Sequence, residues 1–187
     1  MLNNTAEALK KRGFEVAVAS SGEEALALVM EEVAAAESVG WGGSETLKEI
    51  GVREAVASSG AKVVDRHCNA DLFLLSANAL TDDGRIVNID GRGNRVAASI
   101  GGPRRVVYVI GSNKIVQGGL DEAVARIKRE ACPPNCRRLG KNTPCAATGV
   151  CADCDSPDRI CKVTAVFDRK PTGISAKVIL VDGKFGY

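Results

Sequence analysis

The amino-acid sequence predicts one α/β domain, spanning residues 1–187, in which a mostly parallel sheet carries helices on both faces. Segments with the apolar period of helices alternate with short strand-like segments, which is typical of βαβ units. Several strand-like segments are continuous apolar runs, as expected for strands buried on both faces of a sheet. The 187 residues fit a single domain, and neither a repeat nor a linker divides them.

The predicted helices have an apolar face or a recognisable start or stop. Leu2, Ala6 and Leu9 share one face of the first helix, and Gly13 supplies its stop. Ser21 is a capping residue ahead of early carboxylates in the second helix. The predicted helices are residues 2–12, 21–36, 45–50, 52–58, 95–100 and 120–131.

The predicted strands are short, and turn residues separate some of them. Asp83 and Gly84 between two strand-like segments favour a hairpin. The segment 105–110 is the clearest strand, because all but its first residue are apolar or aromatic. The predicted strands are residues 14–18, 38–41, 62–65, 71–75, 85–90, 105–110, 163–167 and 176–181.

The composition excludes several classes of protein. Apolar residues make up 45% and charged residues 26% of the chain, which is ordinary globular usage. A net charge of +2 and 4% aromatic residues argue against a nucleic-acid partner. The first residues lack the pattern of a targeting signal, and no apolar run is long enough to span a membrane. We therefore expect a cytoplasmic protein without a membrane span.

Three polar loops with glycine are predicted at strand ends, where open α/β sheets bind ligands. The first contains Gly42, Gly43, Ser44 and Thr46, and it leads into a predicted helix. Glycines let the backbone approach a ligand, and free N–H groups at a helix start favour an anion. A tight turn with Ser44 as the N-cap explains the same residues, and both interpretations stay open.

The second loop group combines Asn78 with an Asn-Ile-Asp-Gly-Arg-Gly-Asn-Arg run further along the chain. Asp90 and Asn94 in that run can orient a polar ligand together with Asn78. Arg92 and Arg95 can pair with a carboxylate or a phosphate. A hairpin turn with Asn and Asp caps explains part of this pattern.

The third loop directly follows the clearest strand and contains Asn113 and Lys114. A lysine at a strand end is a candidate contact for an anion. By itself this signal is weak, because many surface loops have such a composition.

Six of the seven cysteines lie in one segment, residues 132–161. Cys151 and Cys154 have the C-x2-C spacing that lets two thiolates reach one metal, and Cys145 and Cys161 flank this pair. Four thiolates suit a tetrahedral zinc ion or a four-cysteine iron–sulfur cluster. The spacing does not distinguish the two, and an odd number of cysteines in a reducing compartment argues against disulfides.

Two other interpretations of the cysteines stay open. Buried cysteines can act as small apolar side chains. Cys132 or Cys136 can be a reactive thiol, because two arginines follow Cys136 and favour its thiolate. His67 beside Cys68 is interpreted as a surface or edge histidine, because neighbouring side chains of a strand point apart.

Four motifs together resemble the lactate-utilisation (LUD) domain family. They are GWGGSETLKEIG, SANALTDDGRIVNIDGRGNRVAA, GPRRVVYVIGSNKIV and TPCAATGVCADCDSPDRIC, in the order found in short LUD proteins. The resemblance implies the fold of ribose-5-phosphate isomerase, glucosamine-6-phosphate deaminase and the CoA transferases. Those relatives bind sugar phosphates or CoA thioesters with glycine-rich loops at strand ends. The first two loops described above then become walls of a ligand pocket.

The resemblance also separates the cysteines into two groups. Cys132 and Cys136 are extra relative to similar sequences. The ligand set that the resemblance implies is Cys145, Cys151, Cys154 and Cys161.

This sequence departs from the family in two further ways. The connection between Asp65 and Asp71 is shorter than in related proteins, which alters or opens the pocket. Glu45 is only a nearby carboxylate and not a counterpart of the catalytic glutamate of CoA transferases. The shared fold therefore does not imply CoA-transferase activity.

The expected function is a role in lactate or related 2-hydroxy-acid utilisation, as a partner in an iron–sulfur electron-transfer complex with a [4Fe–4S] cluster. The alternative is a small-molecule enzyme or sensor for a phosphorylated, CoA-linked or carboxylate metabolite, with a structural zinc site. A third hypothesis is an interaction module whose cysteine loop docks a partner. The expected partners are a small anionic metabolite, iron–sulfur or oxidoreductase subunits, and a second copy of the chain.

Overall fold

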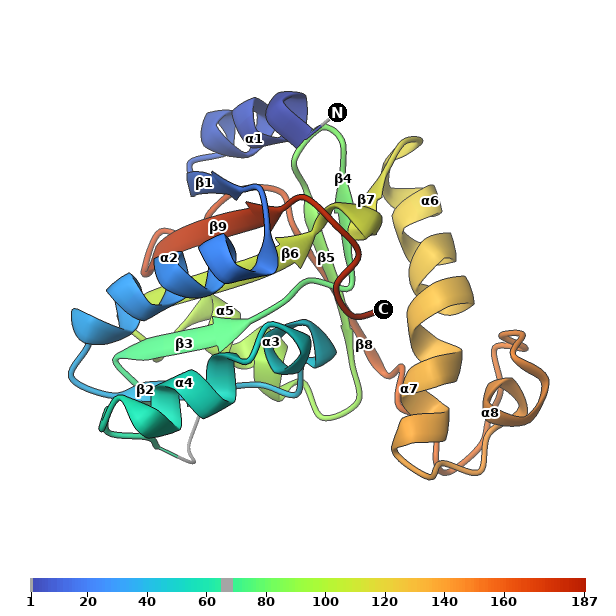
Figure 1. The fold of residues 1–187 in the computed structure, drawn as a ribbon. Helices are drawn as coiled ribbons and strands as arrows, with labels where there is room; N and C mark the ends of the chain where they lie inside the picture. Colours follow the sequence, from blue (N-terminus) through green and yellow to red (C-terminus); the bar gives the residue numbers. More distant parts are fainter. Residues whose placement is uncertain (1, 65–68) are drawn as a thin grey trace.

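The computed structural model of this chain describes residues 2–64 and 69–187 (Figure 1). Its central sheet has five parallel strands in the order β1-β9-β6-β3-β2. The strands are β1 (Glu15–Ala19), β9 (Ser175–Val181), β6 (Arg105–Gly111), β3 (Leu72–Leu75) and β2 (Val39–Trp41). Helices connect several of these strands, as parallel pairing requires. The predicted parallel sheet with helices on both faces is confirmed.

Part of one predicted strand and two residues noted in the sequence lie outside the described residues. Within the predicted strand 62–65, Val63 forms an isolated bridge with Val39. Asp65, His67 and Cys68 belong to the part of the chain that is not described.

A second sheet, which the sequence did not predict as a separate sheet, packs against the first. Its strand order is β7-β4-β5-β8, and β4 and β5 form the predicted antiparallel hairpin. Gly84 in the hairpin turn has φ of +90°, and a Cβ there would lie 2.8 Å from the backbone of Ala8. The turn therefore needs glycine for its conformation and for close packing against the first helix. The strands are β7 (Ile115–Val116), β4 (Ala79–Thr81), β5 (Ile86–Asp90) and β8 (Val163–Phe167).

Three helices cover one face of the central sheet. They are α2 (Gly22–Ala34), α3 (Glu45–Glu49) and α4 (Val52–Ser58). Ala25, Val29 and Val33 of α2 are buried, at the spacing of one helix face. They belong to one apolar cluster with Leu72 and Leu74, the alternate residues of β3 that point to this side.

The opposite face of the central sheet is covered by two helices and by the second sheet. The helices are α1 (Leu2–Lys11) and α5 (Asn94–Ile100). Tyr108 of β6 is 1% exposed on this side, and the rings of Phe14 and Phe167 meet it edge-on with centroids 6.5 and 6.3 Å away. Leu9 of α1 and Ala98 of α5 belong to the same cluster.

A long helical segment covers the outer face of the second sheet (Figure 1). It consists of α6 (Gly119–Arg126), a π-helical turn η3 (Ile127–Ala131) and α7 (Cys132–Arg138). The predicted helix 120–131 therefore continues further, and Cys132 and Cys136 lie on a helix instead of in a loop. Pro133 and Pro134 stand in the first turn of α7, directly after the π-helical turn. A short helix α8 (Pro144–Thr148) and the 3₁₀ turn η2 (Ser112–Lys114) complete the fold.

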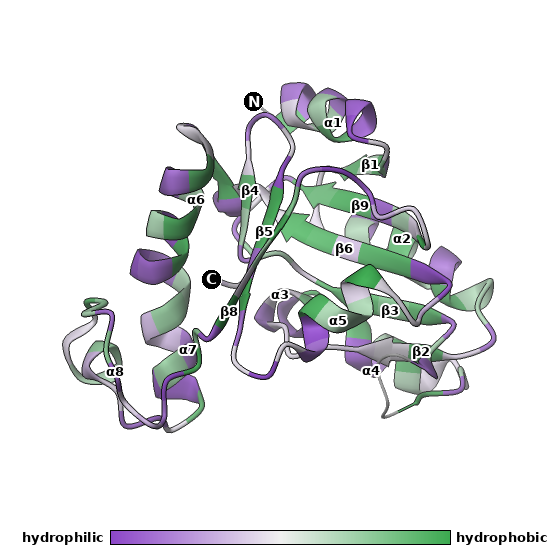
Figure 2. Cartoon of the chain, turned by 180° about the vertical axis from the view of Figure 1, so that it is seen from behind, coloured by the Kyte–Doolittle hydropathy of each residue, from purple (hydrophilic) through white to green (hydrophobic). Residues whose placement is uncertain are grey.

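Apolar residues are concentrated in the strands of both sheets, whereas the helices have mixed faces (Figure 2). This distribution fits the burial of both faces of the central sheet. In the part of the chain that the structure describes, no helix combines the length and the apolar character needed to cross a membrane.

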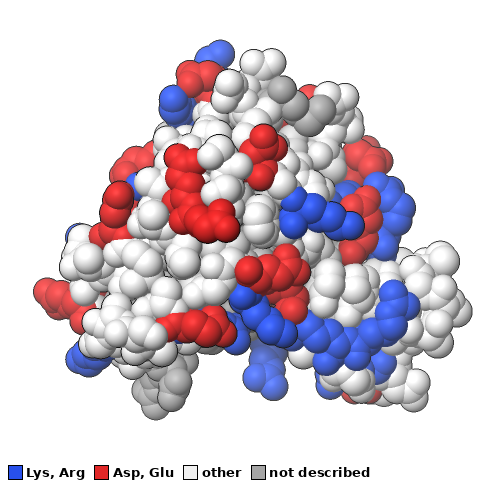
Figure 3. Space-filling model, viewed as in Figure 1, with Lys and Arg blue, Asp and Glu red and all other residues white. Residues whose placement is uncertain are grey.

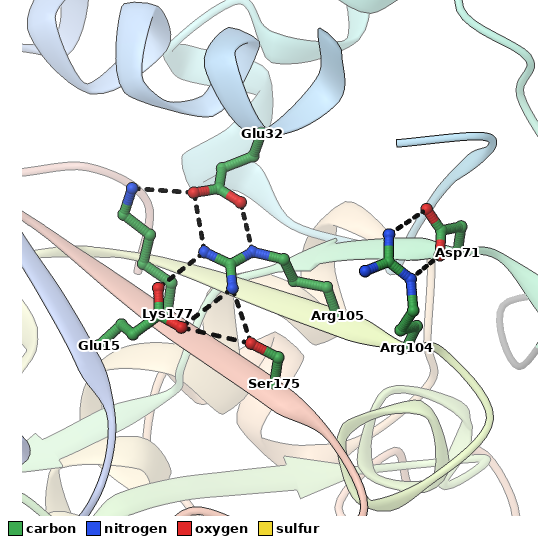
Figure 4. A network of polar contacts seen from close by, with 7 residues as sticks. All are labelled: Glu15, Glu32, Asp71, Arg104, Arg105, Ser175 and Lys177. Carbon is green, nitrogen blue, oxygen red and sulfur yellow. Dashed lines mark hydrogen bonds and ion pairs between the residues drawn. The ribbon is translucent and has the colours of Figure 1, made fainter. Parts of the chain in front are cut away.

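An ion-pair network ties the amino ends of three central strands to α2 (Figure 4). Arg105, at the start of β6, forms ion pairs with Glu32 of α2 and with Glu15 of β1. It also donates to Ser175 of β9 at 2.7 Å, and Lys177 pairs with Glu32 at 2.9 Å. Burial raises the pKa of Glu32, but hydrogen bonds from Arg105 and Lys177 outweigh it and hold the pKa below its usual value.

We predict that Arg105→Met lowers the free energy of unfolding by about 2–4 kcal/mol, because it leaves the half-buried Glu32 with fewer partners. The stabilisation by Glu32 is present at neutral pH and is lost as the pH falls through the lowered pKa, below about 4.5. Urea unfolding at pH 7 and at pH 4 measures both effects. Lys10→Ala, which removes an exposed helical pair with Glu7, is the control and should cost about 0.5 kcal/mol or less. Equal losses in the two variants would contradict the prediction.

Candidate functional site

Asn78 lies where the chain leaves the central sheet after β3 and enters the second sheet at β4. Its side-chain oxygen accepts hydrogen bonds from the Ile89 N–H and the Arg95 guanidinium, both at 3.0 Å. Its N–H donates to the side chain of Asn88 at 2.9 Å, and its carbonyl accepts from Arg126 at 2.7 Å. One asparagine therefore fixes both the path of β5 and the positions of two guanidinium groups.

Asp90 ends β5 and holds Arg95 in place. One carboxylate oxygen accepts from the Arg95 Nε at 2.8 Å, and the other accepts from the N–H groups of Arg95 and Val96 at 3.0 and 3.1 Å. These last two bonds satisfy free donors at the start of α5. A Cβ at Gly42 would lie 2.6 Å from the Arg95 Cγ, so glycine makes room for the Arg95 side chain. Asp90 thus has a structural role, because its carboxylate fixes the conformation of this loop.

A cavity of about 560 Å³ opens beside this ion pair. Its walls come from the loops after β2 and β5, from the end of α7 and from the cysteine segment. The cationic lining residues are Arg92, Arg95, Arg138, Lys141, Arg159 and Lys162. The carboxylates in the lining are those of Asp90 and Asp158. Figure 3 shows Lys and Arg side chains forming a band along the lower right of the molecule.

The charges around the cavity are only partly balanced. Four of the six cations form ion pairs with neighbouring carboxylates. Arg92 and Lys162 form no ion pair within residues 2–64 and 69–187. Six cations against two carboxylates in the wall of one cavity, with two of the cations outside any ion pair, favour an anionic ligand.

Lys114 lies in η2, directly after β6, and its side chain is buried at 3% exposure. Its Nζ donates to the hydroxyls of Thr46 at 2.7 Å and Ser76 at 2.9 Å. Burial, helped by the positive charges of Arg126 and Arg95, lowers the pKa of Lys114 to about 7. Lys114, Arg126 and Arg95 therefore form a cation cluster at the carboxyl edge of the central sheet. The Lys114 amine in this cluster is partly neutral at physiological pH.

Residues 183–187, which we call the strap, cover this lysine. The Thr46 hydroxyl donates to the Phe185 carbonyl at 3.0 Å. The Asn113 side chain bonds the strap twice, donating to the Gly186 carbonyl at 3.1 Å and accepting from the Phe185 N–H at 3.2 Å. The Phe185 ring packs against the apolar cluster beneath α2, and Tyr187 packs against the cluster beneath α6. The strap therefore bridges the two sides of the cation cluster.

The structure divides the nine sequence-predicted binding residues among three places. Those that line the cavity are Gly43, Asp90 and Asn94. Those that gather under the strap are Thr46, Asn113 and Lys114. Those that support the surrounding fold are Gly42, Ser44 and Asn78. Ser44 accepts from the Leu47 N–H at 3.2 Å, so the alternative interpretation of Ser44 as an N-cap is confirmed.

Several residues of the site were not found from the sequence. The sequence does contain a signal for Arg126, because this residue stands with Ala123 and Ile127 on the buried face of its helix. An arginine on such a face must find buried acceptors, and Arg126 donates to two backbone carbonyls. Ser76 and the strap carry no comparable signal, since only the tertiary fold brings them to Lys114.

The six described cysteines are free thiols with different exposure. Cys132, Cys136 and Cys145 are buried, and the other three are half-buried. The Cys136 and Cys145 sulfurs lie 3.7 Å apart. Burial, together with the charges of Cys161, Cys151, Cys136 and Cys145, raises the pKa of Cys132 to about 12. Five cysteines therefore interact electrostatically, including the two that the sequence treated as extra.

The cysteine segment and the cavity share a wall. Arg159 lines the cavity and donates to the carbonyls of Cys161 at 2.9 Å and Cys154 at 2.8 Å. Its third bond is to Asp153, which has φ of +46° in the turn between Cys151 and Cys154. Among residues 2–64 and 69–187, no three His, Cys, Asp or Glu side chains are grouped closely enough to hold a metal ion. The donor types suit a thiolate-bound metal, and the ligand set stays a prediction.

The fold and the motifs have counterparts among known proteins. A protein-family model described as LUD domain matches residues 2–181. A solved structure described as a DUF162 family protein from Deinococcus radiodurans aligns with a TM-score of 0.58 and 16% identity. The alignment covers 96% of this chain and 95% of that chain, and at this identity it shows the fold alone. No curated protein matches the sequence.

We predict that Lys114→Met removes a pH dependence of stability. In the folded protein the pKa of Lys114 is about 7, whereas its ordinary value is 10.5. Between these values the unfolded state binds more protons, so the wild type gains stability as the pH rises, by at most about 1.4 kcal/mol per pH unit. Urea unfolding at pH 7 and pH 9.5 should show this gain in the wild type and a smaller gain in Lys114→Met. Parallel pH dependence in the two proteins would contradict the prediction.

Proposed function

The chain belongs to the LUD domain family, and on that premise we propose that it binds a small anionic metabolite during the utilisation of lactate or a related 2-hydroxy acid. Family membership supports a lactate-utilisation-related role at the level of the family. The observation that carries the finer proposal is the cavity of about 560 Å³ with six cationic residues in its wall. A cavity of this size suits a small metabolite.

The position of the cavity supports a carboxylate or phosphate as the recognised group. Arg92 and Lys162 form no ion pair with a described carboxylate, and an arginine can bind either anion through two hydrogen bonds. Gly43 leaves the opposite wall open, because a Cβ at this glycine would meet no atom within 4 Å. An anion can therefore approach the backbone at the loop after β2.

The cysteine segment supports a second part of the proposal, in which the protein is an iron–sulfur electron-transfer partner of an oxidoreductase. Four cysteine thiolates hold a [4Fe–4S] cluster, and the proposed ligands are Cys145, Cys151, Cys154 and Cys161. Such a cluster, when bound, supplies one-electron transfer. Arg159 contacts both the cavity and the backbone of Cys154 and Cys161, so a ligand in the cavity lies next to the proposed metal centre. Reduced thiols are expected in the cytoplasm.

One observation favours the alternative of an enzyme or sensor with a structural zinc ion. Zn–S bonds of about 2.3 Å in a tetrahedron place two sulfurs about 3.8 Å apart. The Cys136 and Cys145 sulfurs lie 3.7 Å apart, which is close to that separation. This alternative makes Cys136 a ligand, whereas the iron–sulfur proposal does not.

We predict that L-lactate or an anion related to it raises the melting temperature of the protein and gives a measurable dissociation constant by calorimetry. The panel includes D-lactate, inorganic phosphate and CoA. The double variant Arg92→Gln and Lys162→Gln should bind at least about tenfold more weakly, because it loses two charge-assisted contacts. Arg129→Gln is the matched control, since Arg129 is exposed on the helical segment and pairs with Glu122 and Glu130.

Two results would contradict the cavity proposal. One is an absence of binding by the wild type across the whole panel. The other is equal weakening by Arg129→Gln, which would indicate attraction by the overall charge instead of by the cavity.

We predict that anaerobic purification yields a brown protein with iron and sulfide. Cys145→Ser, Cys154→Ser and Cys161→Ser should lose this colour, whereas Cys136→Ser and the control Cys68→Ser should keep it. Metal analysis with an absorption spectrum measures the outcome. One zinc per chain, lost in Cys136→Ser, would favour the alternative, and a protein with neither metal after reconstitution would contradict both assignments.

A further inference from the structure

We propose that Lys114 is a nucleophilic amine that forms an imine with a small 2-oxo acid, in a second site that the strap covers. This site lies under residues 183–187, and Lys114 is not among the residues that line the cavity. The inference therefore does not depend on the ligand proposed for the cavity. The argument rests on the hydrogen bonds of the amine, on the charges around it and on the atoms that the strap places against it.

The hydrogen bonds of Lys114 leave one position on its nitrogen without a partner among the described residues. The Thr46 hydroxyl uses its proton on the Phe185 carbonyl, and the Ser76 hydroxyl is directed at the Ala77 carbonyl at 3.4 Å. Both hydroxyl oxygens therefore act as acceptors toward Lys114, at 2.7 and 2.9 Å. Two N–H groups satisfy these acceptors. A neutral amine has two N–H groups, so its lone pair stays available for attack.

The surroundings favour the neutral amine. Lys114 is 3% exposed, which disfavours its charged form. Arg126 and Arg95 face it with positive charge, and Glu49 opposes them with negative charge. The Glu49 carboxylate accepts the Gly186 N–H of the strap at 2.6 Å, and Lys114 itself forms no ion pair within the described residues. Desolvation and neighbouring cations are the means by which enzymes activate nucleophilic lysines.

The strap shows where the oxygens of a ligand would lie. Its carbonyls at Phe185 and Gly186 accept hydrogen bonds from the Thr46 hydroxyl and the Asn113 amide. Gly186 has no side chain, and a Cβ there would lie 2.6 Å from the Thr46 oxygen and 3.4 Å from the Lys114 nitrogen. When the strap is displaced, the Thr46 hydroxyl and the Asn113 amide become free to donate beside the amine, and the positive charges of Arg95 and Arg126 act on the same place. Donors of this kind fit a carboxylate, and the amine fits a neighbouring carbonyl carbon, which together define a 2-oxo acid.

The reaction balances without a further reactant. The Lys114 nitrogen attacks the carbonyl carbon, a C=N bond replaces the C=O bond, and the oxygen leaves as water with the two protons of the amine. Reduction by cyanoborohydride then adds a hydride to the carbon, and the nitrogen takes a proton from water. The product is a stable secondary amine that mass spectrometry can assign to a single lysine.

The experiment treats the full chain with pyruvate and cyanoborohydride and follows the adduct at each lysine. Gly186→Val should displace the strap and speed labelling of Lys114 at least tenfold over the wild type. Gly173→Ala is the matched control, because Gly173 is exposed and a Cβ there would meet no atom within 4 Å. Phe185→Ala is a second means of loosening the strap if Gly186→Val fails to fold. Acetone in place of pyruvate tests the need for a carboxylate.

The inference is supported if Lys114 is labelled faster than the exposed Lys10 and Lys48 in a strap variant, and faster with pyruvate than with acetone. It is overturned if Lys114 is labelled no faster than those lysines in every folded variant. Equal labelling in wild type and strap variants would overturn the covering role of the strap. Labelling that is unchanged in the Arg92→Gln and Lys162→Gln variant separates this site from the cavity.

Discussion

The arrangement of the candidate site depends on the hydrogen bonds of Asn78. This residue stands where the chain passes from the central sheet to the second sheet, and its polar groups bind β5, Arg95 and Arg126. Buried amide groups are costly unless they are bonded, so the crossing requires partners of this kind. Because the partners include two guanidinium groups, the same interactions that hold the two sheets together also concentrate positive charge at the site.

The two ends of the central sheet use charge differently. At the amino ends, Arg105 is matched by Glu15 and Glu32, and the network fastens β1, β6, β9 and α2 to one another. At the carboxyl ends, cations exceed carboxylates both in the cavity wall and around Lys114. A balanced network contributes to stability, whereas an unbalanced one is available to a ligand. The polarity of the parallel sheet thus separates the two roles in space.

The cavity and the strap-covered lysine are neighbouring but distinct parts of this end of the molecule. Arg95 connects them, since it lines the cavity, bonds Asn78 and acts on Lys114 through its charge. The cysteine segment adjoins the cavity through Arg159 and through the Lys162 N–H, which donates to the Asp90 carbonyl at 2.9 Å. A change in the cysteine segment would therefore act directly on the cavity wall, without passing through the core.

The sequence by itself determined the elements that have their own capping residues, turn residues or apolar pattern. Ser21 accepts from the Glu24 N–H as its position predicted, and the Asp83-Gly84 turn joins β4 and β5 as a hairpin. The apolar runs predicted the parallel central sheet, and the motifs predicted the family. These features depend on contacts between residues that are close in sequence, or on composition, so they can be predicted from the sequence alone.

Tertiary structure alone decided how those elements combine. It set the second sheet apart, extended a helix through Cys136, and gave Asp90 and Ser44 structural roles. It also placed Phe185 and Gly186 against Thr46 and Asn113, which are distant from them in the sequence. The physical reason is that the burial and charge of Lys114 arise from groups distant in sequence, and no local pattern records which of them the fold brings together.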